Sequence, residues 1–254
     1  LDMIKEIQTN CAGIEIYLGF IGYKDFSDLD FGEEYINLEF TKDYENIKKN
    51  IEFVQAEGGG DIPEDLCGAL SLALNKNWSG KSRFAILVTD SPCHGEKYHD
   101  LKGEQGDNYP NGDRDARNIE EYIQSFSKNE ISLYCLKINS TTDKMFKIFQ
   151  DIYEKSKNKD SNNKFVVQQG KKIFDIVTEN CVKTFQSRKN LEIKENNANL
   201  INDDEEEEKE LEQNPSNLGD ISSQRSNEIR TNALSKLDIY IARIGRAVQQ
   251  ECRD

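Results

Sequence analysis

The chain has 254 residues, enough for one sizeable domain with appended segments, and only 36% of its residues are hydrophobic. Its net charge is −14, and residues 203–212 alone supply −7, because that stretch holds eight acidic residues and one lysine. Surfaces that bind nucleic acid need clustered Lys and Arg, so this balance argues against a nucleic-acid partner. No run of eighteen apolar residues exists, so we expect no helix that spans a membrane.

The six cysteines are scattered along the chain and form no CxxC pair. We therefore expect a reducing, intracellular compartment, namely the cytoplasm, with attachment to the cytoskeleton as one option. Glycosylation sequons at Asn77 and Asn139 keep a secreted alternative open. The chain opens at Leu1 with neither an initiator Met nor a signal-like stretch, so we expect it to be a fragment.

Predicted strands and helices alternate along the first three quarters of the chain. Residues 14–23 and 84–88 are nearly continuous apolar runs, typical of strands that are covered on both faces. Residues 35–40 alternate between apolar and polar, as a half-exposed edge strand does, and further strands are expected at 131–138 and 164–167. Apolar residues at helical spacing predict helices around the following positions: Ile47, Ile51 and Val54; Leu66, Leu70, Ala73 and Leu74; Ala116, Ile119, Ile123 and Phe126; Met145, Ile148, Phe149 and Ile152; Ile173, Ile176, Val177 and Phe185.

This alternation predicts an α/β fold, a doubly wound and mainly parallel sheet with helices on both faces. In such sheets ligands bind beyond the carboxyl ends of the strands. Residues 1–187 would form the domain, residues 188–224 an acidic flexible linker, and residues 225–252 a C-terminal amphipathic helix. We expect the apolar stripe of that helix to bind a partner through Leu234, Leu237, Ile241, Ile244 and Val248.

Acidic residues lie where the loops of such a sheet would meet. Asp90 follows an apolar strand directly, and a glycine turn at residues 58–60 places Asp61 near the start of a helix. These carboxylates could converge on a hard cation such as Mg²⁺ or Ca²⁺, which prefers oxygen ligands. The alternative interpretation is a set of turn and capping carboxylates without a metal.

Three blocks of the sequence resemble von Willebrand factor type A domains of the kind linked to atypical alpha-kinases. They are IGYKDFSD at residues 21–28, GGGDIPED at 58–65 and TDSPCHGEKYHD at 89–100. The resemblance covers residues 1–187 and implies a six-stranded Rossmann-like fold that binds protein partners. Many domains of that family carry a metal-ion-dependent adhesion site. It combines an Asp-x-Ser-x-Ser run after the first strand, a Thr in the second loop and an Asp after the fourth strand.

The metal site implied by the resemblance is only half visible in this chain. Asp90 matches the last of those ligands by position, and Asp61 stands about where the Thr is found, but the Asp-x-Ser-x-Ser run is absent. We expect that run and the first strand upstream of the chain, with residues 1–10 as the tail of the following helix. The sheet needs such a strand between residues 14–23 and 84–88, supplied from upstream or by a partner, because unpaired buried amides and carbonyls are costly.

Three functional hypotheses follow. The favoured one is a protein-interaction module, with the type A domain binding a partner and the terminal helix anchoring it in a larger assembly. The second is the regulatory, non-catalytic portion of a larger atypical alpha-kinase-like protein. The third is a metal-dependent hydrolase that uses Asp61, Asp90 and His94.

The loop that contains both histidines offers one further alternative, a zinc site. Cys93, His94 and His99 would be ligands, with Asp100 or Asp107 as the fourth, although only half of a usual paired zinc motif is present. The sequence has no nucleophile elbow, and its two histidines share one loop. We therefore expect no catalytic residues and no enzymatic activity in this chain.

Overall fold

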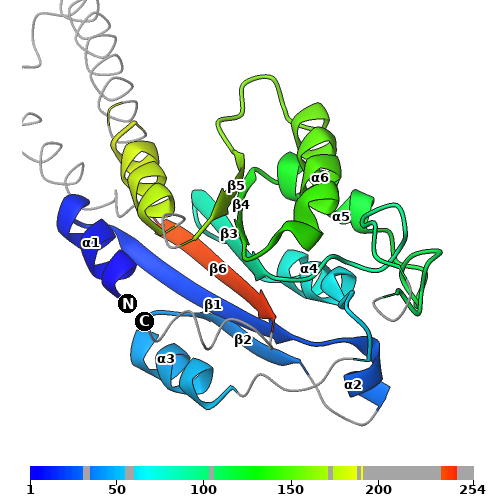
Figure 1. Cartoon of the computed structure of the whole chain (residues 1–254). Helices are drawn as coiled ribbons and strands as arrows, with labels where there is room; N and C mark the ends of the chain where they lie inside the picture. The colour runs from blue at the N-terminus through cyan, green and yellow to red at the C-terminus, as the bar shows by residue number, and fades with distance from the viewer. Residues whose placement is uncertain are drawn as a thin grey trace, which may run out of the picture.

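A computed structural model describes residues 1–30, 35–54, 60–102, 106–170, 174–187, 190 and 236–244. Its centre is a six-stranded sheet with the order β2-β1-β6-β3-β4-β5, flanked by helices (Figure 1). The strands are β1 (Glu15–Tyr23), β2 (Ile36–Thr41), β3 (Ser82–Thr89), β4 (Ile131–Lys137), β5 (Phe165–Gln169) and β6 (Lys236–Ile244). Only the edge strand β2 runs antiparallel to its neighbour, and the other pairs are parallel. The predicted α/β class with a mainly parallel sheet is therefore confirmed.

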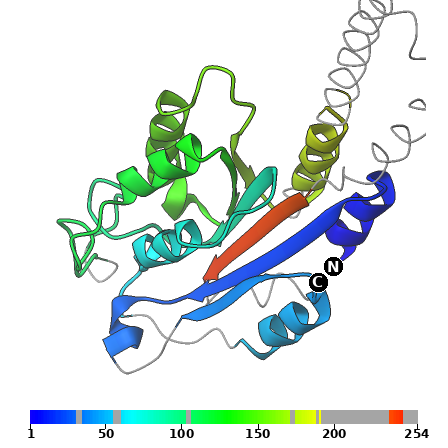
Figure 2. The ribbon, with the colours of Figure 1, turned by 180° about the vertical axis from the view of Figure 1, so that it is seen from behind.

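Helices cover both faces of this sheet (Figure 2). They are α1 (Asp2–Asn10), α2 (Phe26–Asp30), α3 (Tyr44–Phe53), α4 (Leu66–Leu74), α5 (Ile119–Lys128), the 3-10 turn η2 (Ser140–Thr142), α6 (Asp143–Lys155) and a helix at residues 174–187. Helices α1, α3 and 174–187 pack on one face, and α4, α5 and α6 pack on the other. None of the described helices is long and apolar enough to cross a membrane.

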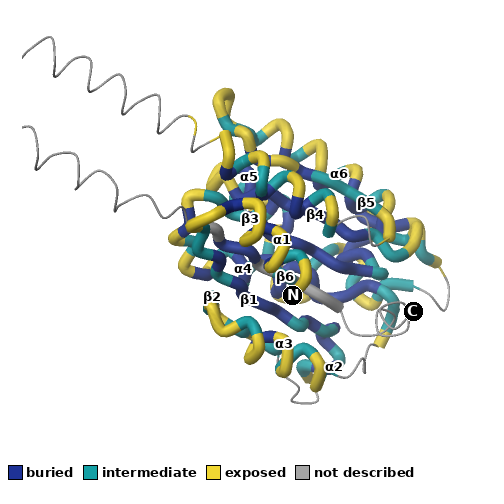
Figure 3. Tube along the Cα trace, turned by 90° about the vertical axis from the view of Figure 1, so that its left-hand side faces the viewer, coloured by how far each residue is buried: buried dark blue, intermediate teal, exposed yellow. Residues whose placement is uncertain are grey.

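The continuous apolar runs of the sequence form strands whose side chains pack into two separate hydrophobic cores, one on each face of the sheet. In β3, Phe84, Ile86 and Val88 point into one core, while Ala85 and Leu87 point into the other. Successive side chains of a strand alternate between faces, so a sheet covered on both sides needs apolar residues at every position. Figure 3 shows the result: β1, β3 and β4 are buried along most of their length, and the outer sides of the helices are exposed.

The central strand of the sheet comes from the far end of the chain. β6 pairs in parallel with all of β1 on one side and with β3, from Ser82 to Val88, on the other. A strand therefore does lie between β1 and β3, as the cost of unpaired backbone groups requires. The expected origin of that strand was wrong, because neither upstream sequence nor a partner supplies it in this structure.

The predicted C-terminal helix is wrong for residues 236–244, which form this strand. The segment satisfies two periodicities, because its apolar residues recur at helical spacing while Leu237, Ile239 and Ile241 also alternate. Pairing with two apolar strands decides between them, and β-branched residues favour the strand. The remainder of the predicted helix, and the predicted linker apart from residue 190, lie outside the described residues.

The expected partner-binding stripe is affected directly by this correction. Leu237, Ile241 and Ile244 belong to β6 and so cannot form one face of a helix there. Leu234 and Val248 lie outside the described residues.

A buried polar contact fastens β6 to the loop that precedes β3. The Gly80 backbone N–H donates a hydrogen bond to the carboxylate of Asp238, which is fully buried. A side chain at position 80 would have no room, because an added Cβ would lie 2.8 Å from the Asp238 Cγ. The glycine thus permits the close approach that this hydrogen bond requires.

Candidate functional site

The carboxyl ends of the parallel strands meet at one edge of the sheet, and the loops that follow them gather there (Figure 1). Asp25 lies just beyond β1, His94 lies in the long loop after β3, and Asp61 lies in the loop that leads into α4. Each of these side chains offers one ligand-type atom, and the three atoms lie within 4.8 Å of one another.

His94 is the centre of a buried hydrogen-bond network. Its Nδ1 lies 2.7 Å from the Asp107 Oδ1, and its Nε2 lies 2.9 Å from the Asp25 Oδ1. All three side chains are almost completely buried, with exposed fractions of 1–2%. A histidine between two carboxylates can donate from both ring nitrogens, which favours its protonated form.

The shifts in pKa agree with that arrangement. Burial opposes protonation of His94, but hydrogen bonds to Asp25 and Asp107 outweigh burial and raise the pKa of the imidazole. Burial also raises the pKa of each carboxyl, yet the hydrogen bond to His94 and further bonds lower the pKa of Asp25 and Asp107 overall. Asp61 behaves differently, because burial dominates and raises its pKa, and the nearby negative charges add to that effect.

Asp107 organises the loop around it through four hydrogen bonds. Besides His94, it accepts from the backbone N–H of Gly95 at 2.6 Å, from that of Tyr109 at 2.7 Å and from the His99 Nε2 at 2.9 Å. The backbone N–H of Leu101 donates to the His99 Nδ1 at 3.3 Å, so His99 carries its proton on Nε2. One buried carboxylate thus joins residues 94–99 of the long loop to residues 107–109.

Aromatic rings enclose the His94 side chain. Phe26 stacks on the imidazole with a centroid separation of 5.1 Å, and Tyr109 meets it edge-on at 5.0 Å. The Arg114 guanidinium also lies over the Phe26 ring, 4.4 Å from its centroid. Such rings exclude water and so strengthen the charged hydrogen bonds beside them.

A second charged network lies at the start of α4. The Arg117 guanidinium donates to Asp65 at 2.6 Å and to the Asp113 Oδ2 at 2.7 Å, and the Tyr35 hydroxyl also donates to Asp65. Asp65 is the N-cap of α4 and accepts from the backbone N–H of Gly68 at 2.7 Å. The network therefore links the helix cap to the end of the long loop.

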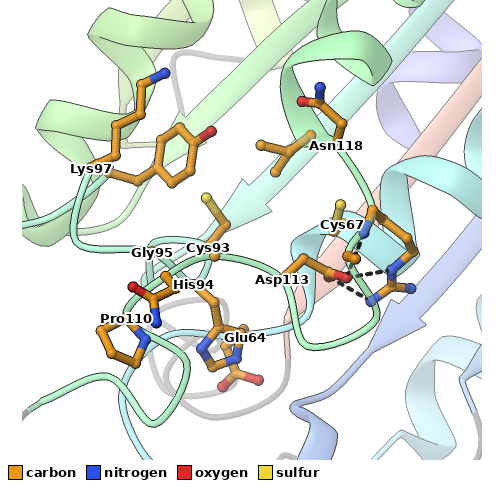
Figure 4. A pocket seen from close by; sticks show the side chains of 15 residues that line it. Glu64, Cys67, Cys93, His94, Gly95, Lys97, Pro110, Asp113 and Asn118 are labelled. Carbon is orange, nitrogen blue, oxygen red and sulfur yellow. Dashed lines mark hydrogen bonds and ion pairs between the residues drawn. The ribbon is translucent and has the colours of Figure 1, made fainter.

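A cavity of about 460 Å³ opens between the two networks (Figure 4). The thiols of Cys67 and Cys93 and the carboxylate of Asp113 are among the groups that line it. Both cysteines are buried and free, and burial raises the pKa of each thiol above its ordinary value. These thiols are therefore protonated at neutral pH and behave as small apolar groups.

No protein-family model matches the chain. The chain is 30% identical over 155 residues to the alpha-protein kinase vwkA of Dictyostelium discoideum. It is thus similar to part of an alpha-protein kinase. The matched stretch covers 60% of this chain but only 24% of vwkA, so most of that kinase has no counterpart here.

The structure brings together only some of the site residues that the sequence singled out. Asp61 lies beside Asp25 and His94, whereas Asp90 is not part of that group among the described residues. Asp90 does follow β3 at the carboxyl edge, and its backbone carbonyl accepts a hydrogen bond from the Thr141 hydroxyl at 2.8 Å.

The zinc arrangement considered for the long loop is not assembled in the described residues. His94 and His99 both turn to Asp107, and the Cys93 thiol lines the cavity instead. The residue that sequence reasoning missed is Asp25. Its signal was present, because Asp25 lies just beyond the apolar run of β1 much as Asp90 lies just beyond β3.

Proposed function

We propose that this domain is a non-catalytic protein-binding module of the von Willebrand factor type A kind, whose partner docks on the loops at the carboxyl edge of the sheet. The observation that carries the proposal is the internal bracing of those loops by the buried His94–Asp107 network. Loops held rigid by a scaffold can bind a partner without a large ordering cost, and they are where doubly wound domains bind ligands.

The test compares two exposed lysines at opposite edges of the sheet. Lys97, on the loop edge, pairs with Glu120 and has a side chain 60% exposed. Lys183, whose side chain is 66% exposed, pairs with Glu179 and lies near the amino ends of β3 and β4. Both can be changed to Glu, so each variant loses one surface ion pair and reverses one charge.

A partner is first captured by cross-linking to the full chain and is then purified. The dissociation constant of its complex with the unmodified chain is compared with that of its complex with each variant. We expect Lys97→Glu to weaken binding at least tenfold, while Lys183→Glu leaves it within twofold. Equal effects of the two variants would contradict docking at the loop edge. Transfer of phosphate from ATP by the purified chain would contradict its non-catalytic role.

A second candidate function rests on the similarity to vwkA. In that view the domain is the regulatory portion of a larger alpha-kinase-like protein. The test uses vwkA from which the matching quarter has been deleted. When the purified chain is added to this shortened kinase, the rate at which the kinase phosphorylates its substrate should change. An unchanged rate at saturating chain would argue against this candidate.

A further inference from the structure

Asp25, Asp61 and His94 form a mixed carboxylate and imidazole cluster at the same edge of the sheet as the proposed docking loops. They come from three different loops, and their ligand-type atoms lie within 4.8 Å of one another. Ligands on a tetrahedral zinc ion lie roughly 3.3 Å apart, given bond lengths of about 2.0–2.2 Å. Each pair of ligand atoms therefore needs to shift by no more than about 1.5 Å to hold such an ion.

The orientation of His94 suits a metal ligand. Its Nδ1 donates to Asp107, a carboxylate that three other donors already hold in place. Metal-binding histidines usually donate their second ring N–H to a carboxylate in this way, which fixes the ring and directs the other nitrogen toward the ion. The His94 Nε2 is accordingly the nitrogen that faces Asp25.

Asp61 supplies an independent observation. Its Oδ2 accepts from the backbone N–H of Asn108 at 2.6 Å, but its Oδ1 is buried and has no hydrogen-bond partner among the described residues. A buried carboxylate oxygen without a partner is costly, and a bound cation would satisfy it.

The charges of the cluster favour a cation as well. Three carboxylates, those of Asp25, Asp61 and Asp107, lie around the single imidazole of His94. Such a set of carboxylate oxygens attracts a cation.

We propose that Asp25, Asp61 and His94 bind one divalent transition-metal ion, of the Zn²⁺ or Mn²⁺ class, with Asp107 as the positioning residue behind His94. The imidazole nitrogen in the ligand set favours such an ion over Mg²⁺ or Ca²⁺, which prefer oxygen ligands throughout. This site shares His94 and Asp107 with the network that braces the proposed docking loops, but metal binding is measured by its own readout, so the two proposals can fail independently.

For the experiment, the full chain is first treated with a chelator and dialysed. It is then titrated in a calorimeter, in one run with ZnCl₂ and in another with MnCl₂. Asp61→Asn removes one ligand charge at a partly exposed position while keeping an acceptor for Asn108. Asp100→Asn is the matched control, because Asp100 lies in the loop that carries His94 but is exposed and pairs with Lys144. We expect one equivalent of metal to bind, at least tenfold more weakly to Asp61→Asn and unchanged to Asp100→Asn.

A second variant and a spectroscopic readout protect this test from folding artefacts. Asp107→Asn should weaken binding about 10–100-fold, as loss of an orienting carboxylate does elsewhere. In histidine NMR spectra of the unmodified chain, metal should shift the His94 Nε2 resonance while Nδ1 stays protonated. Absence of binding, binding unaffected by Asp61→Asn, or equal loss in the Asp100→Asn control would each overturn the proposal.

Discussion

Truncation of Ile239 tests the placement of β6 at the centre of the sheet. Ile239 is fully buried and lies between Leu18 of β1 and Phe84 of β3, which are themselves buried. The alternative amphipathic helix would leave Ile239 outside its apolar stripe, so that arrangement predicts almost no effect. Ile239→Ala therefore distinguishes the strand from the helix in the isolated chain.

The expected loss of stability follows from the groups removed. The substitution deletes a methyl and an ethyl group, each carbon of which contributes about 0.8 kcal/mol when buried. That transfer effect is roughly 2.4 kcal/mol, and the cavity left between two strands raises the total to about 3–4 kcal/mol. Against a typical domain stability of about 5–15 kcal/mol, the variant should still fold but be clearly weakened.

Urea unfolding followed by circular dichroism measures this change. With a slope of about 2–3 kcal/mol per molar for a domain of this size, the midpoint should fall by roughly 1–2 M. Phe53→Ala is the control, because Phe53 is 85% exposed, and its loss should change stability by no more than about 0.5 kcal/mol. If Ile239→Ala lowered the midpoint no further than Phe53→Ala, the central position of β6 would be refuted.

Three further outcomes are expected from the same structure. Gly80→Ala should destabilise the chain by about 1–3 kcal/mol in urea, because its Cβ would lie 2.9 Å from the backbone nitrogen of Asp238. A chain cut after residue 190 should lose cooperative unfolding in calorimetry, since β1 and β3 would each lose a paired neighbour. Burial raises the pKa of Asp113, but hydrogen bonds from Arg117 outweigh burial and hold it below the ordinary value of 3.8. The stability that this ionised carboxyl contributes is therefore present above the ordinary pKa and is lost as pH falls through the lower folded value. The stability deficit of Asp113→Asn, measured in urea from pH 6 to pH 3, should accordingly shrink toward acid, and a deficit that stays constant would contradict this ion pair.

Local pattern predicted the greater part of the fold. The apolar run at residues 84–88 is a fully covered strand, and the alternation at residues 35–40 is the antiparallel edge strand. Helical spacing likewise located α3 to α6 and the helix at 174–187. These predictions succeeded because the spacing of apolar residues along a helix or strand depends on whether one or both of its faces are buried.

The candidate site was predictable only in part. Sequence placed Asp61, Asp90 and the two histidines at the carboxyl edge, but it could not show which side chains point toward one another. In the structure His94 turns to Asp25 and Asp107, which lie 69 and 13 residues away in the chain. Such pairings depend on how separate loops close, and no local spacing records them.

The sequence by itself determined the sheet class, the order of elements up to residue 187 and the need for a strand between β1 and β3. Only the tertiary structure decided that residues 236–244 fill that position. Those residues fit a helix and a strand about equally well by pattern, and isolated propensity differences are small. The two apolar strands on either side offer hydrogen-bond partners for both edges of β6, and that long-range pairing outweighs the local preference.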